Sequence, residues 1–143
     1  MQSFIFSLGI ETVQFKMDVQ TIEIDKGLGF IESQSVRNQR LDALAIENMI
    51  EVIEEILEQL KLDYKTQRIA QISDAYLQQL SHLFFQNARV IDRIKLEHAF
   101  NEFVERMEYY AEQAGFDFKL FAYFVFVREM MHHLNVVEIK LLN

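Results

Sequence analysis

The 143-residue sequence contains no cysteine, no proline and no tryptophan, and it has only four glycines. Without cysteine, the chain has no disulfide, no zinc–thiolate site and no cysteine nucleophile. The absence of proline favours long helices, because proline breaks the hydrogen-bond ladder of a helix. A cysteine-free chain is typical of a reducing compartment, so we expect a cytoplasmic location.

Basic residues are also scarce, with 14 Lys and Arg against 22 Asp and Glu and a formal net charge of −8. Nucleic-acid affinity depends largely on basic side chains that neutralise phosphates, so no nucleic-acid partner is expected. The most apolar run, residues 118–127, is about half of what a bilayer span needs, and the N-terminus lacks the features of a secretory signal. No membrane partner is therefore expected.

The first 35 residues have the alternation of β-strands. Val13, Phe15, Met17 and Val19 share one parity, and the parity slips near residues 20–21, where a bulge or a turn would explain it. A turn at residues 25–27 predicts that residues 28–32 return as a hairpin partner, and residues 3–8 are expected to form another short strand.

After residue 35 the apolar period becomes helical, and the pattern predicts four helices. The expected ranges are 41–60, 69–83, 96–114 and 117–134. Asp92 and Gly115 are the expected start and stop signals of the third helix, and Asp117 is the expected cap of the fourth. Residues 118–127 are rich in strand formers, so a strand is the alternative there; as a helix, this segment would be central and buried.

The tail from residue 136 to residue 142 alternates again and is expected to join the N-terminal sheet as a strand. The expected fold is therefore α+β, with a small antiparallel N-terminal sheet, joined by a C-terminal strand, packed on a bundle of about four helices. The chain is expected to be a single domain over residues 1–143. Residues 1–35 would be β-rich, residues 36–134 helical and residues 135–143 the C-terminal strand.

The first predicted helix carries acidic residues without any basic ones. Five of them fall in one sector of the helix: Glu47, Glu51, Glu54, Glu55 and Glu58. Like charges one turn apart repel, and ordinary solvated helices mix both signs. The pattern is typical either of a plain solvated face or of a surface that docks a basic protein partner. A carboxylate metal site on this face alone is a weaker interpretation, because one helix face cannot surround a cation.

Histidines and glutamates at helical spacing are the candidate metal ligands. Glu129 and His132 form an E-x-x-H pair, and His98 lies one turn from Glu102. Di-iron bundles use two E-x-x-H motifs, of which this sequence has one. The alternative is that these histidines only interact with helix ends and solvent.

No stretch of the sequence matches a known family motif, and no serine nucleophile motif or phosphate-binding loop is present. The composition favours a non-enzymatic protein-binding module, such as an inhibitor, an immunity-type protein or a secretion chaperone, that docks a basic partner and needs no cofactor. The alternative is a helical-bundle protein that binds a metal or a small ligand and could be an enzyme, with the many phenylalanines lining its cavity. A homo-oligomer that pairs through a sheet edge or an aromatic surface is a third hypothesis.

Overall fold

The computed structural model describes residues 1–142, which contain six strands and six helices. The strands are β1 (Gln2–Leu8), β2 (Val13–Lys16), β3 (Thr21–Ile24), β4 (Arg68–Ile72), β5 (Val90–Asp92) and β6 (Val136–Leu141). The helices are α1 (Leu28–Ser35), α2 (Ala43–Glu58), α3 (Ala75–Phe84), α4 (Arg93–Glu105), α5 (Met107–Gln113) and α6 (Phe118–His133).

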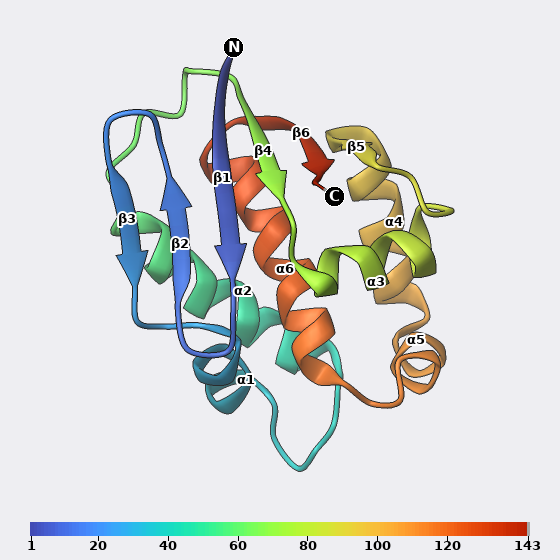
Figure 1. Ribbon diagram of the computed structural model, residues 1–143. Coiled ribbons are helices and arrows are strands. Elements are labelled where there is room, and N and C mark those ends of the chain that lie inside the picture. The colour runs from blue at the N-terminus through green and yellow to red at the C-terminus, as the bar shows by residue number, and fades with distance from the viewer. Residues whose placement is uncertain (143) are drawn as a thin grey trace.

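All six strands form one mixed sheet in the order β3-β2-β1-β4-β6-β5 (Figure 1). The three central strands β1, β4 and β6 are parallel, whereas β2, β3 and β5 pair antiparallel. The prediction of a small antiparallel sheet on about four helices is therefore wrong. It failed because parallel pairing joins segments far apart in the chain, which local periodicity does not record.

Strand β4 occupies part of the second predicted helix. Ile69 and Ile72 are spaced three residues apart, which fits one face of a helix, but the burial alternates instead, with Arg68, Ala70 and Ile72 facing the core. The helix begins only after this strand, at Ala75. Strands β4 and β5 thus both lie in the range that was predicted to be helical.

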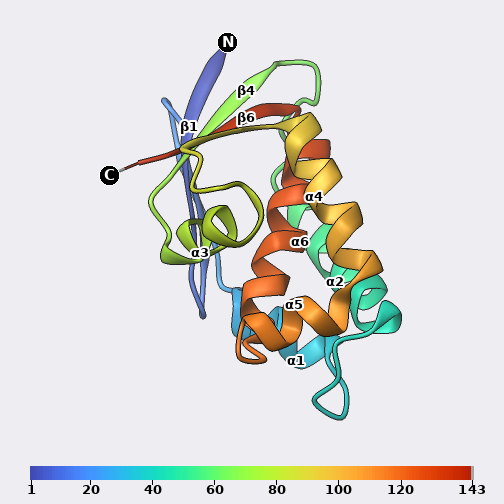
Figure 2. The ribbon, with the colours of Figure 1, turned by 90° about the vertical axis from the view of Figure 1, so that its right-hand side faces the viewer.

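Helices α2, α4 and α6 lie on one side of the sheet (Figure 2). On that side the strands contribute large apolar side chains, such as Phe4 and Phe6 of β1 and Phe15 of β2, which are almost fully buried. On the opposite side of β1, Ser3, Ile5 and Ser7 are exposed. The sheet is therefore covered by helices on one face and open to solvent along β1 on the other.

Helix α6 is the centre of the core, as expected for a helix that is apolar nearly all round. On the side of α6 that faces the sheet, the ring centre of Phe126 lies 5.6 Å from that of Phe6. On its other side, Phe121 stacks on Phe103 of α4 at 4.7 Å. The phenylalanines thus pack against one another and fill the core, where each buried ring contributes about 1.5–3 kcal/mol.

Two further predictions about the helices are corrected. Residues 28–32 belong to α1 rather than to a hairpin strand. The third predicted helix is divided at Arg106, whose backbone (φ −133°, ψ 43°) is not helical, into α4 and α5. The expected cap of α4 is confirmed, because the carboxylate of Asp92 accepts a hydrogen bond of 2.8 Å from the backbone N–H of Lys95.

The C-terminal strand is β6, which lies between β4 and β5 and so joins the sheet well inside it. Among residues 1–142, no helix combines the length and the apolar character that crossing a bilayer requires.

Candidate metal centre

Two glutamates and one histidine converge where the last turns of α2 and α6 pack together. One ligand atom each of Glu54, Glu129 and His133 lies within 4.8 Å of the other two. Glu129 and His133 are four residues apart on α6, so they lie on the same face of that helix. Glu54 reaches them from α2, which places ligands from two helices around one point.

This donor set has the composition of a transition-metal site. A histidine nitrogen with two carboxylate oxygens suits Zn²⁺, Mn²⁺ or Fe²⁺, whereas Mg²⁺ and Ca²⁺ prefer oxygen ligands alone. Donor atoms around a tetrahedral Zn²⁺ lie about 3.4 Å apart, so rotamer adjustments of about 1 Å would close the observed cluster around an ion. Three protein ligands would leave a coordination position for water or substrate.

Glu129 is the buried member of this cluster, with 7% of its side chain exposed. Burial raises the pKa of its carboxyl, and the neighbouring Arg128 guanidinium acts in the opposite direction. Arg128 Nη1 donates a hydrogen bond of 3.1 Å to Glu129 Oε2. A buried carboxylate beside an arginine therefore faces a second carboxylate, Glu54, and an imidazole.

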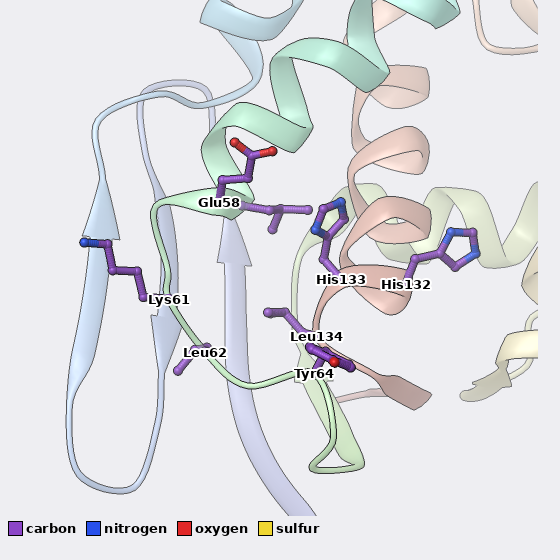
Figure 3. A pocket seen from close by; sticks show the side chains of 8 residues that line it. Glu58, Lys61, Leu62, Tyr64, His132, His133 and Leu134 are labelled. Carbon is purple, nitrogen blue, oxygen red and sulfur yellow. The ribbon is translucent and has the colours of Figure 1, made fainter.

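A pocket of about 430 Å³ adjoins this cluster. It lies between the end of α2, the following loop and the end of α6, and His133 belongs both to the pocket wall and to the cluster (Figure 3). Both apolar and polar side chains line it, namely Leu57, Glu58, Lys61, Leu62, Tyr64, His132, His133 and Leu134. A small molecule in this pocket would therefore lie next to an ion held by His133.

Only one of the four metal ligands predicted from the sequence, Glu129, lies in this cluster. His132 is directed elsewhere (Figure 3), and its Nε2 is 3.5 Å from Glu97 Oε2 of α4. His98 is exposed on α4, and Glu102 accepts a hydrogen bond from the hydroxyl of Tyr110. Glu54 was assigned to the acidic face of its helix instead, and the four-residue spacing of Glu129 and His133 was the available signal for this pair.

The five acidic residues predicted to contact a partner lie along α2, as expected. Glu47, Glu51, Glu55 and Glu58 are exposed, whereas Glu54 is half-buried and belongs to the candidate metal centre. Their contact with a basic partner stays a prediction, as does the homo-oligomer.

A second polar cluster lies at the carboxyl ends of the parallel strands β1 and β4, where open α/β sheets commonly bind ligands. Asp74, which follows β4, accepts hydrogen bonds from the Leu8 backbone N–H at 3.0 Å, from the Tyr123 hydroxyl at 2.7 Å and from the Ser7 hydroxyl at 3.4 Å. Both of its oxygens are thus engaged by the protein's own donors. Asp74 links β1 to α6, which is a structural role.

The neighbouring glycines do not form a phosphate-binding loop. The first N–H groups of α1, at Leu28 and Gly29, donate to the carbonyl oxygens of Gly9 and Ile10 at 2.9 Å each. Two of the N–H groups that could bind an anion at this helix start are therefore already used, in agreement with the absence of the sequence motif.

No known protein family matches this sequence, and no curated protein is similar to it. Solved structures nevertheless share its fold. The type II variant of the Aquifex aeolicus Ppx/GppA phosphatase superposes with a TM-score of 0.73 and 11% sequence identity, covering 98% of this chain and 52% of the phosphatase chain. Another structure of the Aquifex aeolicus PPX-GPPA enzyme gives a TM-score of 0.72 at 11% identity and covers 99% of this chain and 53% of the other.

At this level of identity, the likeness shows the fold, and the chain spans about half the length of these enzymes. The fold of nearly the whole chain is thus one found in a phosphatase. This finding overturns the prediction of a non-enzymatic binding module of the inhibitor, immunity or chaperone type, and it agrees better with the alternative of a metal- or small-ligand-binding protein that could be an enzyme.

Proposed function

We propose that this protein binds a divalent first-row transition metal between α2 and α6. The observation that carries the proposal is the convergence of Glu54, Glu129 and His133 within 4.8 Å. The mixed nitrogen and oxygen donors support Zn²⁺, Mn²⁺ or Fe²⁺ rather than Mg²⁺. Because these ligands come from two helices, they can surround a cation, which the acidic face of α2 alone cannot do.

We further propose that the metal-loaded protein hydrolyses a phosphate ester. The observation that favours this second function is the phosphatase fold that covers 98% of the chain. A protein-bound divalent ion polarises a phosphoryl oxygen and lowers the pKa of bound water, which supplies a nucleophile at neutral pH. The pocket beside His133 has room for a small ester next to the ion.

Metal binding is tested by calorimetric titration of the protein with Zn²⁺ and, separately, with Mg²⁺. We expect one Zn²⁺ per chain, bound at least about tenfold more tightly than Mg²⁺ because of the imidazole ligand. His133→Ala removes that ligand and should weaken Zn²⁺ binding by about 10- to 100-fold.

His132→Ala is the matched control, because it removes an imidazole from the adjacent position that contacts Glu97 instead. Equal weakening by the two variants, or unchanged binding by His133→Ala, would show that the cluster is not the metal site. Hydrolysis of p-nitrophenyl phosphate by the Zn²⁺-loaded and Mn²⁺-loaded protein tests the second function, which fails if His133→Ala retains the full rate.

We also propose a cytoplasmic location, supported by the absence of cysteine. Fractionation of cells that express the protein tests it.

A further inference from the structure

Arg128 is held in place from three directions. Its Nη2 and Nε donate to the two carboxylate oxygens of Glu97 on α4, at 2.8 and 3.3 Å. Its guanidinium carbon lies 4.6 Å from the ring centre of Phe100, in a cation–π contact. The third side of the group, Nη1, is directed to Glu129. The contacts with Glu97 and Phe100 therefore fix the position from which the guanidinium of Arg128 contacts Glu129.

This contact orients the carboxylate of Glu129. Nη1 donates to Oε2 at 3.1 Å, which leaves Oε1 as the oxygen that this arginine does not contact. Carboxylates that bind metals are usually oriented by such a hydrogen bond, and losing it typically costs 10- to 100-fold in affinity. The positive charge also offsets part of the repulsion between the buried carboxylate of Glu129 and Glu54.

We propose that Arg128 is a positioning residue of the metal centre: braced by Glu97 and Phe100, it presents Glu129 to the ion. The proposal rests on the metal binding proposed above. It makes the centre a unit of three helices, because Glu97 lies on α4, Arg128 and Glu129 on α6, and Glu54 on α2.

The experiment uses Co²⁺, whose visible absorption reports coordination geometry as well as binding. Arg128→Gln removes both the charge and the planar guanidinium. Arg128→Lys keeps the charge, but its single ammonium cannot contact Glu97 and Glu129 as the planar guanidinium does. Glu97→Gln weakens the ion pair that holds Arg128 and leaves every proposed ligand in place. Arg106→Gln is the control, because Arg106 is stacked on Tyr109 at 4.2 Å, away from these ligands.

We expect Arg128→Gln to weaken Co²⁺ binding by about 10- to 100-fold and to change the spectrum. Arg128→Lys should recover only part of the affinity and should keep the altered spectrum. Glu97→Gln should weaken binding about threefold, and this effect should disappear in the Arg128→Gln background, because Glu97 acts only through Arg128. Arg106→Gln should bind Co²⁺ as the unaltered protein does.

Unaltered affinity and spectrum in Arg128→Lys would overturn the positioning role, since charge alone would then suffice. An effect of Glu97→Gln that persists without Arg128 would overturn it as well. If Arg128→Gln fails to fold, Arg128→Lys and Glu97→Gln decide the question. If the unaltered protein binds no Co²⁺, the metal-binding function itself is wrong, and that result is distinct from unchanged binding by the variants.

Discussion

At the scale of single residues, Asp74 shows how one carboxyl group joins distant parts of the chain. It follows β4, and it accepts hydrogen bonds from Leu8 at the end of β1 and from Tyr123 in the middle of α6. Burial raises the pKa of this carboxyl above its ordinary value, although its three hydrogen-bond donors act in the opposite direction. The folded protein therefore holds the Asp74 proton more tightly than the unfolded chain does.

This shift predicts a pH dependence of stability. Between the ordinary value near 3.8 and the raised pKa of Asp74, the folded state binds more protons than the unfolded state. The contribution of Asp74 to the free energy of unfolding therefore decreases as pH rises through that window. Asp74→Asn removes the titration, so its stability relative to the unaltered protein should increase as pH rises across the same window, as measured by urea unfolding.

Asp18→Asn is the control for this measurement, because Asp18 is exposed in the turn between β2 and β3. A difference between Asp74→Asn and the unaltered protein that stays constant with pH would contradict the assigned burial effect.

The proposed metal ligands show, also at the residue scale, how far the sequence predicts the site. Glu129 was predicted as a ligand because of a histidine on the same helix. His133 rather than His132 accompanies it, because the rotation of α6 in the core decides which of two adjacent imidazoles faces α2. A helix that is buried nearly all round has no polar stripe from which this rotation can be read.

At the scale of elements, long segments were predictable and short ones were not. Helix α2 has an apolar stripe and α6 a continuous apolar run, and both were expected close to their observed ranges. Strands β4 and β5 have five and three residues, too few for a distinct period. Their identity depends on pairing with β1 and β6, which is a property of the folded chain.

Helix α1 depends on a close backbone contact at its start. A methyl group on Gly27 would lie 2.5 Å from the carbonyl oxygen of Gly9 and 2.6 Å from that of Ile10. Gly27→Ala should therefore push α1 away from the turn between β1 and β2 and lower the free energy of unfolding by about 2–3 kcal/mol. Chemical denaturation measures the change.

Gly9→Ala serves as the comparison, because its methyl group would meet no atom closer than 3.8 Å. Its effect should be within about 0.5 kcal/mol. Equal destabilisation by the two substitutions would show that general glycine flexibility, rather than the close contact at Gly27, is responsible.

At the scale of the whole molecule, the sheet is assembled from segments that lie far apart in the sequence. Strand β6 pairs with β4 on one side and β5 on the other. Removing residues 135–143 should therefore abolish cooperative folding. Near-ultraviolet circular dichroism and urea unfolding compare the shortened chain with the full one, and a cooperative transition of unchanged steepness in the shortened chain would contradict the expectation.

The parallel centre of the sheet also sets the order of events while the protein is being made. Strand β4 is synthesised some sixty residues after β1, and β6 follows β4 by a similar number of residues, so β1 and β4 each form before the parallel neighbour that pairs with them. Contacts between distant segments form slowly. Until helix α6 has been synthesised, the phenylalanines of β1 and β2 lack the helix that covers them in the folded protein. Until α6 and β6 have been synthesised, this apolar face is therefore exposed, which favours aggregation of the incomplete chain.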